Sequence, residues 1–167
     1  MKHLVISFIS PDRPGLVDAI SNLVNQYQGN WQTSSMHHMS GFFAGVIEIA
    51  VSEQQSALLI NDLNAIKELD SIIKIASPHS DKQLPSVVLE LTANDRAGIV
   101  QEISSVIHNQ GGNLLKLVSR QESAPHSGQD LFKAKVTVVI DTNNLDELIH
   151  AIENQFRHVL HVPPPYA

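Results

Sequence analysis

The chain has 167 residues, of which 43% are hydrophobic, and a formal net charge of −6; this composition predicts a packed protein of one ordinary domain or two small ones. The absence of cysteine excludes disulfides, thiolate catalysis and zinc–thiolate sites. The negative charge is spread over both halves and no run of Lys and Arg stands out in the sequence, so direct nucleic-acid binding is not expected.

The N-terminal stretch, "MKHLVISFISPDRPG", carries a hydrophobic run that is interrupted after a few residues. A signal peptide or a membrane span needs a longer apolar segment. We therefore expect a cytoplasmic protein that does not bind membranes.

A strand, a charged turn and a helix open the chain. The apolar run "LVISFI" (4–9) is typical of a strand, and "SPDRPGLV" (10–17) follows it as a turn. Apolar residues then recur every three or four positions, which predicts a helix with one buried stripe. This stripe consists of Leu16, Ile20, Leu23, Val24 and Tyr27. Gly29 is expected to stop the helix.

Two extended segments, a second helix and a closing strand complete the first half. The extended segments cover about 31–39 and 42–51, and the second helix shows its apolar face at Leu59, Leu63 and Ile66. The short apolar segment "SIIKIAS" closes the unit. The polar stretch "SPHSDKQLPS", which contains two prolines, is typical of a linker. We place a first domain at 1–77, the linker at 78–85 and a second domain at 86–167.

The second half repeats the first. A shift of 83 residues aligns 4–31 with 87–114, so that "SPDRPGLV" (10–17) falls on "ANDRAGIV" (93–100). Further on, 42–51 resembles 131–140 at a shift of 89, which places about six extra residues in the second copy. The order β-α-β-β-α-β in each copy predicts an α+β protein of two tandem ferredoxin-like domains, each an antiparallel sheet with helices on one face. Because one such unit has a thin core, pairing of copies, including a homo-oligomer, is compatible with this fold.

The repeated turn combines an acidic residue, an arginine and a glycine. Asp12 and Asp95 are expected to cap the helix that follows, a contribution of about 1 kcal/mol. Gly15 and Gly98 leave the backbone bare, and a helix N-terminus with bare amides favours a carboxylate or a phosphate. The alternative interpretation is a strand-to-helix turn that binds nothing.

A second recurring feature is the pair Gly-Asn at 29–30 and 112–113. The first helix runs back along the sheet, so Asn30 and Asn113 are expected far from the turn of their own copy. A neighbouring copy could bring its asparagine close, and the amide offers a donor and an acceptor to an amino acid. The alternative is a glycine at the end of a helix followed by a turn residue.

The order of strand, "DRPG" or "DRAG", amphipathic helix, "GN" and two strands resembles the ACT domain, a small regulatory module that binds amino acids. Two copies with little else resemble the glycine cleavage system transcriptional repressor family. The resemblance implies an amino-acid sensor, for glycine or a similar ligand, whose site lies at a domain interface. It also implies regulation of transcription through an activator-type protein partner, without direct contact with DNA. The implied site residues are Asp12, Arg13, Gly15, Leu16 and Asn30, with Asp95, Arg96, Gly98, Ile99 and Asn113.

No residue pattern predicts catalysis or a cofactor. His37 and His38 are neighbours on a predicted strand and face opposite ways, so a shared metal ion is not expected. No nucleophile motif and no phosphate-binding glycine loop with lysine occurs. We predict a protein that is not an enzyme. The remaining alternative to a sensor is a structural or protein-interaction module that binds no ligand.

Overall fold

The computed structural model describes residues 1–77, 85–156 and 158–162 of the chain. The chain divides into two compact units, Met1–Ser80 and Asp81–Ala167, which are described separately below. Of the predicted linker, residues 78–84 lie outside the described residues. In the described part of the chain, no helix is both long and apolar enough to span a membrane.

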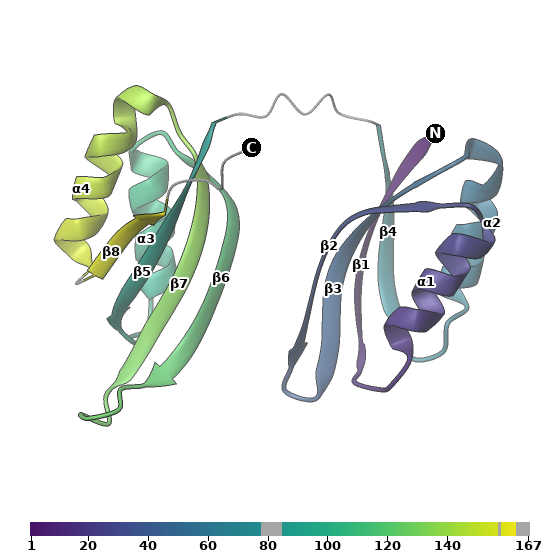
Figure 1. Ribbon diagram of the computed structural model, residues 1–167, viewed down its shortest axis with the longest axis horizontal. Coiled ribbons are helices and arrows are strands. Elements are labelled where there is room, and N and C mark those ends of the chain that lie inside the picture. The colour runs from purple at the N-terminus through teal and green to yellow at the C-terminus, as the bar shows by residue number, and fades with distance from the viewer. Residues whose placement is uncertain (78–84, 157, 163–167) are drawn as a thin grey trace. The chain divides into compact units, whose positions relative to one another are not determined.

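The first unit is an antiparallel four-stranded sheet with two helices on one face, as Figure 1 shows. Strand β1 lies inside the sheet, in the order β2-β3-β1-β4, and pairs with β3 and β4. The sheet face opposite the helices is called the open face below. The elements are β1 (Lys2–Pro11), α1 (Leu16–Gln26), β2 (Asn30–Met39), β3 (Phe42–Val51), α2 (Glu53–Asn64) and β4 (Asp70–Ala76).

The second unit repeats this arrangement in the order β6-β7-β5-β8, again with its helices on one face (Figure 1). The predicted order β-α-β-β-α-β is therefore confirmed in both copies. A single 3₁₀ turn, Thr142–Asn144, precedes the last helix. The elements are β5 (Ser86–Asn94), α3 (Ile99–Asn109), β6 (Asn113–Ser123), β7 (Asp130–Val139), α4 (Leu145–Gln155) and β8 (His158–Val162).

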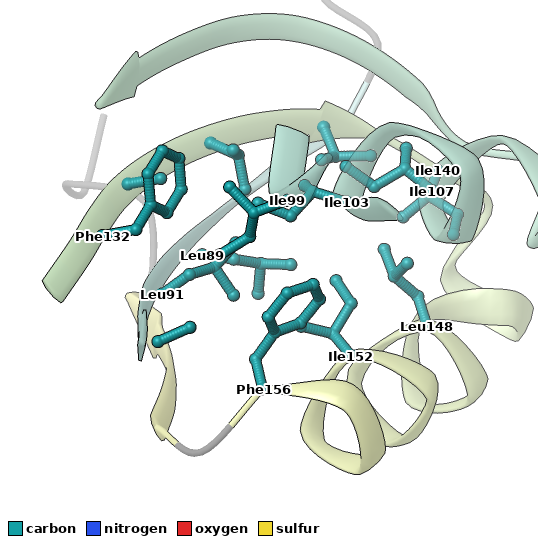
Figure 2. Close-up of a cluster of buried hydrophobic side chains, with 14 residues drawn as sticks. Leu89, Leu91, Ile99, Ile103, Ile107, Phe132, Ile140, Leu148, Ile152 and Phe156 are labelled. Atoms are coloured by element: carbon teal, nitrogen blue, oxygen red, sulfur yellow. The ribbon is translucent and has the colours of Figure 1, made fainter. Parts of the chain in front are cut away.

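Each unit has its own hydrophobic core between its sheet and its helices. In the first unit, Leu16, Ile20 and Val24 of the predicted stripe are buried against the sheet. Figure 2 shows the core of the second unit, where Leu89 and Leu91 of β5 lie between side chains of α3 and α4. Alternate residues of the central strands point to the other face of the sheet, which the helices of the same unit do not cover.

The glycine at the end of the first helix differs from the expectation in the first unit only. Helix α1 ends at Gln26, and the left-handed residue after it is Gln28 (φ 53°), so Gly29 does not stop the helix. Glycine at position 29 instead lets the backbone lie close to the Val24 side chain, because a Cβ there would lie 3.0 Å from Val24 Cγ1. In the second unit the two roles fall on separate glycines: Gly111 is left-handed (φ 75°), and Gly112 is packed against Ile107.

Candidate functional site

The two β-α turns have the same backbone geometry. Helix α1 begins at Leu16 and α3 at Ile99, and each follows a glycine in the left-handed conformation, with φ of 82° at Gly15 and 85° at Gly98. A Cβ at either glycine would meet no atom within 4 Å. Glycine is therefore favoured here by its backbone conformation, and the space beside it is open.

The expectation that Asp12 and Asp95 cap these helices is wrong. The N-cap positions are Gly15 and Gly98, and neither helix has a side-chain cap. Each aspartate lies three residues before its N-cap and is tied to a hairpin instead. The N–H of Asp12 donates to Gly41 O at 2.9 Å, and the N–H of Asp95 donates to Asp130 O at 2.9 Å.

The two aspartate carboxylates face side chains of the neighbouring hairpin strands. Asp12 Oδ2 lies 3.5 Å from His38 Nε2 on β2, and Asp95 Oδ2 accepts a 2.8 Å hydrogen bond from Gln121 Nε2 on β6. Neither carboxylate accepts a hydrogen bond from the N–H groups at the start of the helix that follows it. Since Asp12 is exposed, its charge is available to a cationic group of a ligand.

The arginines of the turns reach toward the end of the second helix of their unit. Arg13 Nη2 donates to Lys67 O at 3.3 Å, in the segment after α2. Arg96 lies 5.9 Å from the Phe156 ring centroid at the end of α4, and its guanidinium also pairs with Glu102 of α3. A cation near the C-terminal end of a helix is favoured by the helix dipole.

Four of the predicted residues line one hollow in the first unit. The hollow has a volume of about 280 Å³ and is lined by Asp12, Arg13, Gly15, Leu16, Val17, Asp18 and Phe43. The Leu16 side chain is buried in the core, as is that of Ile99 in the second unit. Leu16 can contact a ligand chiefly through its backbone N–H, which lies in the first helical turn and lacks an intrahelical partner. The N–H of Ile99 donates to Arg96 O at 3.4 Å.

The asparagines lie at the opposite end of the sheet from the turn of their own unit. Asn30 opens β2 and pairs with Ala50, which also pairs with His3 near the start of β1. Asp12 lies nine positions after His3, about 30 Å along a strand. Asn113 pairs with Val139 in the same way. Within one unit the structure does not bring the turn and the asparagine together.

Several residues beside the turn were not found from the sequence. Phe43 and His38 come close only because the β2–β3 hairpin returns beside the end of β1. Asp18 was detectable as an acidic residue in the first turn of the predicted helix, a position that favours negative charge. His37 contacts Ser35 at 3.3 Å rather than sharing a partner with His38, and no cluster of three metal-binding side chains occurs among the described residues.

We expect Gly15→Ala to lower the free energy of unfolding by about 1–2 kcal/mol, the cost of a left-handed conformation in a residue with a Cβ. The Cβ has room, so no clash adds to this cost. Denaturant unfolding followed by the fluorescence of Trp31 measures the effect in the first unit. Gly15→Asn serves as the control and is expected to cost less, since asparagine tolerates this conformation. Equal stability of the alanine variant and the wild type would contradict the left-handed geometry.

Comparison with known proteins finds a family model that matches the first unit and solved structures that share the fold of the whole chain. Residues 2–75 match the family model of the ACT domain. The crystal structure of an unknown protein from Galdieria sulphuraria matches with a TM-score of 0.79 at 23% identity, over 97% of this chain and 99% of that one. A putative glycine cleavage system transcriptional repressor matches with a TM-score of 0.68 at 19% identity, over 96% of this chain and 97% of that one. No curated protein matches the sequence.

Proposed function

Because residues 2–75 form an ACT domain and the second unit repeats its fold, we propose that this chain is a regulatory protein that binds a small amino acid at its β-α turns. The observation that carries the proposal is the hollow at the first turn, where a carboxylate, a guanidinium and bare helix amides meet. These groups match the two charges of an amino acid. The volume of about 280 Å³ suits a small ligand such as glycine.

The acidic and basic groups that line the hollow suit the two oppositely charged ends of an amino acid. Asp12 and Asp18 are exposed and line the same hollow, and their negative charge suits the ammonium group. The first N–H groups of α1 and the Arg13 guanidinium suit the carboxylate. The charged groups of both turns have partners within their unit, but of different kinds. Arg13 donates to the neutral carbonyl of Lys67, whereas Arg96 pairs with the carboxylate of Glu102, which competes with a ligand carboxylate. We therefore expect the first turn to bind more tightly than the second.

We further propose that the bound state is read by a protein partner that controls transcription of glycine cleavage genes, rather than by DNA. The fold shared with the putative repressor and the net charge of −6 support this proposal. The absence of a catalytic motif in the sequence supports a role that is not enzymatic. Co-purification of a transcription activator with the tagged full chain, altered by the amino acid, tests this step. Equal recovery with and without the amino acid would contradict it.

The alternative, an interaction module that binds no ligand, is favoured by one observation. The open face of the first unit carries the exposed apolar residues Ile9, Phe42, Val46 and Ile72. Such an accumulation is typical of a surface that contacts another protein. Ligand binding separates the two functions, because only the sensor is stabilised by a small molecule.

A thermal denaturation screen of the amino acids with the full chain tests the sensor. A ligand at one hundred times its Kd stabilises the native state by about 2.7 kcal/mol, so the midpoint must rise with concentration. We expect a small amino acid to raise the midpoint and Asp12→Asn to abolish the rise, since the variant loses the charge that faces the ammonium. Asp70→Asn, which removes an exposed carboxylate of the same unit outside the hollow, is the control and keeps the rise. If no amino acid at millimolar concentration raises the midpoint, the sensor is refuted.

A further inference from the structure

The open face of the second unit gathers cations that are scattered in the sequence. Lys116 and Arg120 of β6 and Lys133 and Lys135 of β7 line one hollow of about 470 Å³. These are four of the six Lys and Arg residues in 84–167. The strand register explains the gathering: Lys133 pairs with Arg120, and Lys135 with Val118, while alternate residues face the core.

Two glutamates offset only half of this charge. Glu122 pairs with Arg120 and, at 2.7 Å, with Lys133, and Glu90 lies 3.6 Å from Lys135. The hydrogen bond from Lys133 lowers the pKa of Glu122, with smaller contributions of the same sign from the nearby positive charges, so its carboxylate is ionised at neutral pH. Four cations and two carboxylates leave a formal charge of +2. For Lys116 the described part of the chain shows no ion-pair partner.

The first unit has no such cluster on its open face. The repeat aligns Lys133 with Ala44 and Lys135 with Val46, and the strand registers agree, since each residue lies opposite the aligned position of β1 or β5. In the same way Lys116 is aligned with Thr33 and Arg120 with His37. The fold therefore does not require cations at these positions: the second copy carries a charged hollow where the first carries mainly uncharged residues.

We propose that this hollow is a second ligand site, which binds a small molecule bearing a phosphate monoester. A phosphate monoester carries a charge close to −2 at neutral pH, which balances the formal charge of the face. The Arg120 guanidinium suits two phosphate oxygens, and lysines bind phosphate as point charges. The hydroxyls of Thr92 and Thr137 line the same hollow and can donate further hydrogen bonds.

The lining favours a small molecule over a single-stranded nucleic acid. Nucleic-acid sites on open four-stranded sheets stack bases on aromatic side chains. The residues that line this hollow include no aromatic side chain, and Glu90 lies beside Lys135 on the same face. A volume of about 470 Å³ is within the range of small-molecule pockets.

An NMR titration of the ¹⁵N-labelled full chain with glycerol 3-phosphate at pH 7.5, at constant ionic strength, tests the proposal. We expect saturable shifts of amide signals in β6 and β7. The variant Lys133→Ala with Lys135→Val is expected to bind at least about tenfold more weakly, because it loses charge-assisted hydrogen bonds. It carries the residues of the first unit at these positions. Lys116→Thr, which also introduces the residue of the first unit at the aligned position, is expected to weaken binding of glycerol 3-phosphate on its own.

The control variant Lys2→Ala with Lys74→Ala removes two cations from the first unit and is expected to bind as the wild type does. Four results would overturn the proposal: no saturable shift, the same shifts with glycerol and sodium chloride, equal weakening in the control, or equal affinity for succinate. Tighter binding of a thymidine oligonucleotide through the same strands would also overturn it, in favour of a nucleic-acid surface. Dispersed amide signals of each variant show that it is folded.

Discussion

Leu148→Ala is expected to lower the free energy of unfolding of the second unit by about 2–5 kcal/mol, because it removes most of a fully buried side chain and leaves a cavity. Leu148 lies on α4 and belongs to the core that Figure 2 shows, where its side chain points toward Ile107 of α3 and Ile140. Since the two cores share no residue, the first unit is expected to keep its stability.

The single tryptophan of the chain separates the two units in this experiment. Trp31 packs against the core of the first unit, so its fluorescence reports that unit, whereas far-ultraviolet circular dichroism reports both. For Leu148→Ala we expect a dichroism transition at a lower guanidinium chloride concentration than in the wild type, and an unchanged fluorescence midpoint. Leu59→Ala, at the aligned buried position, is the matched control and moves the fluorescence midpoint. An equal shift of both signals for Leu148→Ala would contradict separate cores.

Gly45→Ala is expected to destabilise the first unit by about 1–3 kcal/mol through overpacking. Gly45 lies on β3 between two neighbouring strands, opposite Met36 of β2. An added Cβ would lie 2.5 Å from Met36 Cγ and 2.7 Å from Ser35 O, closer than such atoms can approach. Guanidinium unfolding followed by Trp31 fluorescence measures the loss. A variant as stable as the wild type would contradict this packing.

The second unit suggests how the same substitution can be tolerated. The position aligned with Gly45 is Ala134, and its partner across the strands is Ser119 instead of a methionine. We expect the pair Met36→Ser and Gly45→Ala to lose less stability than the sum of the two single variants, by at least about 0.5 kcal/mol. Met36→Ser alone is the control for lost burial. Strict additivity would show that the clash with Met36 does not determine the cost.

The fold was predictable because the duplication repeats each signal. A single apolar stripe such as Leu16, Ile20 and Val24 predicts a helix, and its recurrence 83 residues later at Ile99, Ile103 and Ile107 confirms the interpretation within the sequence itself. Turn residues and β-branched runs recur in the same order. Tertiary packing did not override these local preferences in the first helix of each unit, which buries the stripe that its pattern predicts.

The details of the turn were less predictable. An aspartate before a helix predicts a cap, but the left-handed glycine between Asp12 and the helix shifts the N-cap to Gly15 and turns the carboxylate toward the β2–β3 hairpin. That choice depends on the hydrogen bond from the Asp12 N–H to Gly41 O, which joins residues far apart in the sequence. The asparagines were correctly expected at a distance from their own turn.

The cation cluster could not be found by searching the sequence for a basic run. Lys116, Arg120, Lys133 and Lys135 are separated by other residues, and only the pairing of β6 with β7 places them on one face. A one-residue change of register would move one strand's cations to the helix side. Long-range strand pairing, which a local pattern does not encode, therefore decides the charge of this surface.

The most direct measurement of the central claim is an NMR titration of the full chain with the amino acid that gives the largest thermal stabilisation. We expect saturable shifts centred on the amides of Leu16 and Val17, because these N–H groups lie at the free end of α1 beside the hollow. Asp12→Asn is expected to abolish them and Asp70→Asn to keep them. Saturable shifts confined to residues away from both turns, or the same shifts in Asp12→Asn, would contradict amino-acid binding at the turn.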